Sequence, residues 1–177
     1  EFLPALSALL RRLFAFSKPL VVAANGHAIA GGCLLVMCAD RRLMAQGKGR
    51  IGIPELLVGV TFPATAFGIA RWVLYPERIQ RLVYEGFTPT ASEAVEWGLA
   101  DEVVLGDRLE ARAMHAAVEL ARIPADAFRR TKQQLRCEAL AAIDKAAAET
   151  DAATLAAWCD PATHARIREY LERTLGR

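Results

Sequence analysis

Apolar positions recur with different periods along the chain. Over Phe2–Phe16 they return every three or four residues, which predicts an amphipathic helix. Ser17-Lys18-Pro19 follows, and we expect the helix to end there because the residue before a proline avoids the helical region. Leu20–Ala24 is a short apolar run with two adjacent valines, which is typical of a buried strand. Turns are predicted at residues 25–27 and 30–32, where asparagine and glycines gather.

Short strands and helices continue to alternate over the first hundred residues. The predicted helices are Cys33–Ala39, Pro63–Leu74, Pro76–Glu85 and Thr90–Trp97, and the predicted strands are Arg42–Ala45, Arg50–Ile53 and Glu102–Leu105. Thr90 and Glu93 have the spacing of a capping box, which marks the start of one of these helices. Gly47–Gly49 is predicted to be a hairpin-like turn, and Pro54–Gly59 is predicted to be a loop.

Only helices are predicted after residue 106. They are Asp107–Arg122, Ala125–Arg136, Leu140–Cys159 and Pro161–Leu175. We therefore predict an α/β core over residues 1–106 and an all-helical region over residues 107–177. Tyr170 and Leu171 lie on the apolar face of the last helix, and we interpret that face as a surface that docks on another subunit.

Composition narrows the possible partners. The 177 residues are 54 % apolar and carry a net charge of only +2, which argues against binding to nucleic acid or to an anionic membrane. The apolar stretch Leu20–Leu35 is interrupted by polar residues and is too short to span a bilayer. The four cysteines lack the paired spacing of a zinc site and lie in apolar contexts, so we expect reduced, buried thiols in a cytoplasmic protein. They are Cys33, Cys38, Cys137 and Cys159.

Two features carry candidate chemistry. Gly31 and Gly32 open a predicted helix, whose first N–H groups have no partner within the helix and whose dipole favours negative charge. Such a terminus can bind a phosphate or stabilise an oxyanion, although a tight turn that needs glycine is the simpler explanation of the pair taken alone. Glu55 lies in an otherwise apolar stretch, where desolvation would raise its pKa and suit it to proton transfer; an exposed loop glutamate is the alternative. Cys33 is interpreted as a buried structural thiol rather than a nucleophile.

Several ordered motifs together resemble the crotonase superfamily, which includes the enoyl-CoA hydratases and isomerases. They are Lys18-Pro19-Leu20-Val21-Val22-Ala23-Ala24-Asn25-Gly26-His27-Ala28, Ala30-Gly31-Gly32-Cys33, Cys38-Ala39-Asp40-Arg41, Ile51-Gly52-Ile53-Pro54-Glu55, Val58-Gly59-Val60 and the segment 91–104. The resemblance covers nearly the whole chain. It implies a crotonase-like spiral of ββα turns, followed by a helical region that assembles as a homotrimer or hexamer.

The resemblance also implies an acyl-CoA substrate, with no cofactor beyond the coenzyme A of that substrate. The backbone N–H of Gly31 would hold the thioester oxygen, and Glu55 would transfer protons. Ala28, Gly32 and Leu34 would contribute to substrate binding.

One departure from the hydratase pattern bears on the reaction. Hydratases use a second carboxylate one position after Cys33, and this chain has Leu34 there. A single carboxylate can take a proton from C2 of an enoyl-CoA and return it to C4, so the resemblance favours Δ3-Δ2 isomerisation. The acid that dienoyl-CoA isomerases carry after this glutamate is absent from residues 61–71. Hydration of a 2-enoyl-CoA and non-catalytic acyl-CoA binding remain the alternatives.

The chain starts at Glu1, directly before a predicted helix. Family members carry about a further third of chain before the position that matches Phe2, in line with ordinary domain sizes. We therefore expect that an N-terminal part of the fold, with the first strands of the spiral and a second oxyanion donor, is missing from this sequence.

Overall fold

Two small parallel sheets form the centre of the molecule. A computed structural model describes residues 1–175 of the chain. Strands β1 (Val21–Ala24), β3 (Arg41–Ala45) and β5 (Glu102–Val104) form one sheet in the order β1-β3-β5, and β2 (Ala28–Ile29) pairs with β4 (Ile51–Gly52) in the other. The first two passages along the chain each add one strand to each sheet before a helix follows, and β5 then extends the first sheet. This arrangement confirms the predicted α/β spiral of ββα turns.

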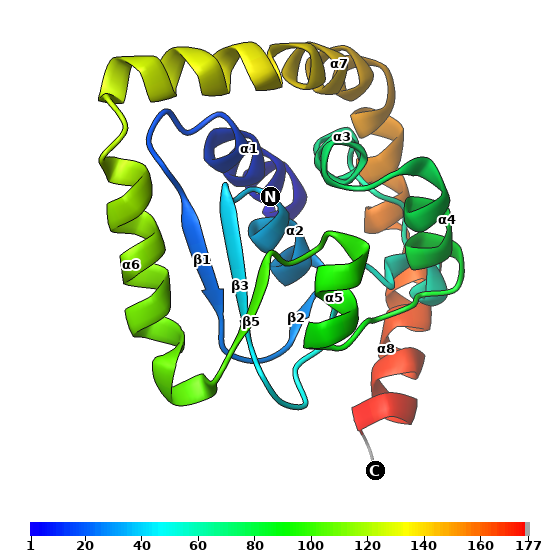
Figure 1. Ribbon diagram of the computed structural model, residues 1–177. Coiled ribbons are helices and arrows are strands. Elements are labelled where there is room, and N and C mark those ends of the chain that lie inside the picture. The colour runs from blue at the N-terminus through cyan, green and yellow to red at the C-terminus, as the bar shows by residue number, and fades with distance from the viewer. Residues whose placement is uncertain (176–177) are drawn as a thin grey trace.

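Helices surround these sheets (Figure 1). The first is α1 (Phe2–Phe14), and α2 (Gly31–Met37) follows β2 directly. The chain then forms the short 3-10 helix η1 (Glu55–Val58) and the helices α3 (Ala64–Val73), α4 (Pro76–Tyr84) and α5 (Ala91–Trp97). A second 3-10 turn, η2 (Gly106–Arg108), leads into α6 (Leu109–Ala121), which packs along β1 and β3. The chain ends with α7 (Ala125–Cys159) and α8 (Pro161–Leu175). No described helix is both long and apolar enough to cross a membrane.

Helix α7 corrects one prediction. Two helices were expected, but one continuous helix of 35 residues runs from Ala125 to Cys159. The expected break at residues 137–139 contains neither glycine nor proline, so nothing stops the helix there. The helix instead turns in its second half (Figure 1), close to where the Thr150 hydroxyl donates to the carbonyl of Ala146 (2.9 Å). A hydroxyl that bonds to the preceding turn in this way often bends a helix.

The sheets correct two further predictions. Gly47–Gly49 does not close a hairpin, because β3 and β4 belong to different sheets. Strand β2 lies between two predicted turns and escaped prediction because two residues are too few to show a period of two. By contrast, the capping box at Thr90 and Glu93 is confirmed, with hydrogen bonds in both directions at the start of α5.

The cysteine prediction is half right. Cys33 and Cys38 are fully buried, whereas Cys137 and Cys159 are exposed. Both exposed thiols belong to α7, which buries a single stripe formed by Lys132, Arg136, Ile143 and Thr154. Residues 137 and 159 fall off this stripe at helical spacing, so an apolar sequence context did not make them core residues.

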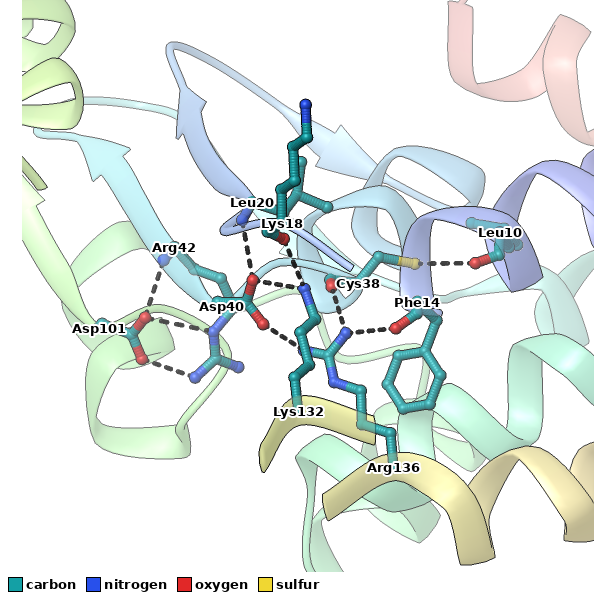
Figure 2. Close-up of polar contacts among 10 residues, drawn as sticks. All are labelled: Leu10, Phe14, Lys18, Leu20, Cys38, Asp40, Arg42, Asp101, Lys132 and Arg136. Carbon is teal, nitrogen blue, oxygen red and sulfur yellow. Dashed lines mark hydrogen bonds and ion pairs between the residues drawn. The ribbon is translucent and has the colours of Figure 1, made fainter. Parts of the chain in front are cut away.

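A buried ionic cluster holds the first half of α7 against the core (Figure 2). Asp40, between α2 and β3, accepts from Lys132 Nζ (2.6 Å), from Arg136 Nη2 (2.8 Å) and from the backbone N–H of Leu20 (2.8 Å). Arg136 Nη1 also donates to the carbonyl of Phe14 at 2.6 Å. The cluster joins the end of α1, the start of β1, the end of α2 and the face of α7. It fixes the base of α2, the helix whose other end forms part of the site.

Candidate active site

Glu55 begins η1, immediately after β4 and the conformationally restricted Pro54. Its Oε2 atom is buried and has no hydrogen-bond partner among the described residues. Burial raises the pKa of this carboxyl from 4.5 to about 7, mainly because the charged form is desolvated. The partial burial of Glu55 agrees with the predicted desolvation and not with an exposed loop glutamate. A carboxyl with such a pKa is present both as acid and as base near neutral pH.

The start of α2 supplies backbone donors. Residues 31–33 form its first turn, where N–H groups have no acceptor within the helix, and the first intrahelical bond runs from Leu34 N to Ala30 O (3.2 Å). Ala30 has φ of +56°, a conformation that residues other than glycine rarely adopt. Its own N–H donates to Gly52 O at 2.8 Å, which ties this strained residue to the second sheet. Ala30 on one side and the first turn of α2 on the other therefore fix the direction in which the Gly31 N–H points.

Glu55 and the start of α2 face one apolar cavity of about 190 Å³. Its walls come from α1, the start of α2, η1, the segment before α3, and the end of α7. The residues that line it are Phe2, Leu3, Leu6, Ser7, Leu10, Ala30, Gly31, Leu34, Glu55, Thr61, Phe62, Pro63, Ala66 and Trp158. Glu55 is the one carboxylate in this set of described residues. The cavity can hold an apolar molecule with a base and backbone donors beside it.

The structure brings together three of the five predicted site residues. Gly31, Leu34 and Glu55 all line the cavity. Ala28 lies in β2, where it is paired with Ile51 and is only 6 % exposed, and it is outside the lining set. Gly32 is the second residue of α2 and is also outside that set. Their roles in substrate binding stay predictions.

Sequence reasoning missed the part of the wall that α7 supplies. Trp158 lines the cavity, and its indole Nε1 donates to the backbone carbonyl of Thr61 at 2.7 Å. The only signal in the sequence is a tryptophan near the end of an alanine-rich helix. Because Trp158 and Thr61 are 97 positions apart, no local pattern could pair them.

Cys33 lies close enough to Glu55 for their charges to interact. The pKa of its thiol is raised far above its usual value, by burial first and by the Glu55 carboxylate second. A thiol that stays protonated is a poor nucleophile, so the structure agrees with the structural interpretation. Residues 1–175 contain no group of three or more side chains that could hold a metal ion.

Comparisons with known proteins agree with this geometry. Residues 1–174 match the family model for enoyl-CoA hydratase/isomerase. Mouse mitochondrial enoyl-CoA delta isomerase 1 is 32 % identical over 126 residues, which make up 71 % of this chain and 44 % of the relative. The 2,3-dehydroadipyl-CoA hydratase of Escherichia coli is 34 % identical over 127 residues, 71 % of this chain and 49 % of the relative. This chain thus spans about half the length of the curated relatives it matches.

Solved structures show the same relationship. An enoyl-CoA hydratase/isomerase family protein from Pseudomonas syringae superimposes with a TM-score of 0.77 at 30 % identity, over 81 % of this chain and 63 % of that one. Human mitochondrial Δ3-Δ2-enoyl-CoA isomerase gives a TM-score of 0.85 at 26 % identity, over 96 % of this chain and 66 % of that one. The chain therefore belongs to the enoyl-CoA hydratase/isomerase family.

Proposed function

We propose that the full-length protein is an enzyme that moves the double bond of an enoyl-CoA thioester from the Δ3 to the Δ2 position, with Glu55 as the proton shuttle. The observation that carries this proposal is the orphan carboxylate oxygen of Glu55, which is buried beside an apolar cavity. Because Oε2 has no hydrogen-bond partner among the described residues, it is free to accept a proton from a substrate C–H. Its raised pKa makes both the removal and the return of a proton feasible near pH 7.

In the proposed reaction, the Glu55 carboxylate removes a proton from C2 of the bound 3-enoyl-CoA. The electrons of that C–H bond spread into a dienolate, whose negative charge gathers on the thioester oxygen. The N–H of Gly31 donates to this oxygen and stabilises the charge as it develops. Protonated Glu55 then gives the same proton to C4, which leaves the double bond between C2 and C3 and regenerates the carboxylate. No cofactor enters this sequence of steps.

The side chain at the position of the second hydratase carboxylate supports isomerisation over hydration. Adding water to a double bond requires a held and activated water as well as a proton donor, a task that two carboxylates can share. Leu34 stands where the second carboxylate would be; it lines the cavity and is only 3 % exposed. An apolar side chain at that place offers a water no hydrogen bond. Hydration remains the second candidate because a hydratase, the E. coli relative, is as similar to this chain as the mouse isomerase is.

The two activities are separated by supplying the full-length protein with a 3-enoyl-CoA and, separately, with a 2-enoyl-CoA. We expect rapid conversion of the first to the conjugated 2-enoyl-CoA and slow addition of water to the second. Faster hydration than isomerisation would reverse the assignment. Binding of both thioesters without turnover would instead indicate a non-catalytic acyl-CoA-binding protein. Glu55→Gln should reduce the isomerase kcat by about 10²–10⁴-fold, the usual contribution of a general base.

We further propose that the protein assembles as a homotrimer or hexamer and works in a reducing compartment such as the cytoplasm. Large apolar side chains on and after α6 support assembly, since Met114 is 61 % exposed and Val118 is 50 % exposed. Two exposed free thiols, Cys137 and Cys159, are typical of a reducing environment. Light scattering of the full-length protein tests the assembly directly, and a monomer at micromolar concentration would contradict it.

A further inference from the structure

The end of α7 is fastened to the segment that leads into α3. Asp151 Oδ1 accepts from the backbone N–H of Ala64 at 2.9 Å, and so caps the first turn of α3. About two helical turns further on, Trp158 Nε1 donates to the carbonyl of Thr61. Gly68 on α3 leaves no room for a Cβ atom against Ile143, so the two helices approach closely. The indole of Trp158 is therefore held in a fixed position relative to α3.

In this position the indole of Trp158 forms part of the wall of the cavity beside Glu55. Trp158 is half-buried and is the largest side chain among the lining residues. The indole N–H already has a backbone partner, so the ring presents only apolar surface to a ligand. The cavity measures about 190 Å³, which is below the range of about 300–1,000 Å³ that is typical of ligand pockets.

We propose that Trp158 determines the length of the acyl chain, and that it restricts the enzyme to short-chain enoyl-CoA thioesters. This inference rests on the proposed function, because it identifies the cavity as the place where the acyl chain binds. The indole fills the space into which a longer chain would extend. Trp158 acts on substrate selection and takes no part in the proton transfer.

The test compares variants of the full-length protein on six-carbon and twelve-carbon 3-enoyl-CoA substrates. Trp158→Ala should raise the ratio of kcat/KM for the long over the short substrate by about tenfold or more, because even one methylene in an apolar pocket is worth about tenfold. Trp158→Leu should give a smaller rise in this ratio, since it fills part of the space. Trp158→Phe should leave it within about threefold of the wild type, because most of the aromatic wall remains.

Trp97→Phe is the matched control. Trp97 is also half-buried, but it packs against Phe87 and lies outside the cavity. This variant should leave the chain-length ratio unchanged. A wild type that already handles both lengths equally, or a Trp158→Ala variant that loses activity equally on both, would overturn the proposal.

Binding measurements keep this test separate from the proposed function. The Kd values of saturated six-carbon and twelve-carbon acyl-CoA thioesters are measured by titration calorimetry for the same variants. We expect Trp158→Ala to shift the ratio of these Kd values toward the longer chain. If the wild type binds the thioesters but turns over neither enoyl substrate, the isomerase assignment fails and the Kd ratio still decides the role of Trp158. An unchanged Kd ratio in Trp158→Ala would refute that role even in an active enzyme.

Discussion

Two buried carboxylates near opposite ends of α2 have opposite surroundings. Asp40, which follows α2, accepts from two cationic side chains and from a backbone N–H (Figure 2). Glu55, near the start of α2, has a buried oxygen with no partner among the described residues. The first arrangement satisfies a charge and fixes helices to one another. The second leaves a charge poorly satisfied, which raises the pKa of Glu55 to about 7 and keeps it available for a substrate.

This contrast shows how one core supports both rigidity and reactivity. Lys132 and Arg136 hold α7 in place. Both side chains are more than nine-tenths buried, and their charged groups bond to other groups of the protein. The residues around Glu55 are almost entirely apolar and offer it little stabilisation. Changing each carboxylate to its neutral amide should therefore have opposite consequences for the free energy of unfolding.

The largest effect on stability is expected from Asp40→Asn. This change leaves two buried cations without their negative partner, which costs about 3–5 kcal/mol in the free energy of unfolding. Urea denaturation of the full-length protein measures it. Asp144→Asn is the control, because Asp144 pairs with Arg11 on the surface, where both side chains are nearly half exposed. That variant should lose less than about 1 kcal/mol, and equal losses in the two variants would contradict the structural role of Asp40.

A smaller, pH-dependent effect is expected from Glu55→Gln. Between pH 4.5 and about 7 the folded protein holds a proton on Glu55 that the unfolded chain has released, so the wild type loses stability as the pH rises through this window. Glutamine does not ionise, so the variant does not lose stability in this way as the pH rises. The stability of the variant relative to the wild type should therefore increase by about 2 kcal/mol between pH 5 and pH 8. Denaturation curves at the two pH values measure this difference.

Glu149→Gln on the exposed surface of α7 is the control for this experiment. Its effect should stay below about 0.5 kcal/mol at both pH values. If Glu55→Gln shows the same small, constant effect, the carboxyl of Glu55 is not desolvated and the comparison with Asp40 fails.

The smallest effect is expected at Ala30, on the reactive side of the comparison. Its φ of +56° is strained for alanine and relaxed for glycine. Ala30→Gly should therefore stabilise the fold by about 1 kcal/mol, or raise the Tm by about 2–4 °C. Ala28→Gly, in the buried strand β2, should have the opposite sign. A lower Tm for Ala30→Gly would mean that the backbone there carries no strain.

Local patterns in the sequence predict much of the fold. The capping box of α5, the strands of the three-stranded sheet and most helices follow from spacing, turn residues and caps, which act over a few positions. Strand β4 lies within the predicted strand Arg50–Ile53, but its partner β2 could not be found in this way, because a two-residue strand gains its stability from pairing with a distant segment. The continuity of α7 was missed because a change in local composition was interpreted as a break.

The same distinction between local patterns and long-range contacts applies to the candidate site. Gly31, Leu34 and Glu55 belong to motifs that the sequence displays, and they meet at the cavity. The desolvation of Glu55 could be predicted from its apolar neighbours in the chain. Trp158 and the docking of Lys132 and Arg136 on Asp40 could not, since these contacts join residues that lie about 90 or more positions apart. Such contacts depend on how α7 packs, which local spacing does not specify.

The most direct test of the central claim is the pH dependence of kcat/KM for a 3-enoyl-CoA. This quantity reports the protonation of the free enzyme, and the reaction needs the Glu55 carboxylate in its charged form. We expect kcat/KM to level off above about pH 7 and to fall tenfold for each pH unit below it, in line with the raised pKa of Glu55. A profile that stays flat from pH 5 to pH 8 would contradict the account of Glu55 as a desolvated proton shuttle.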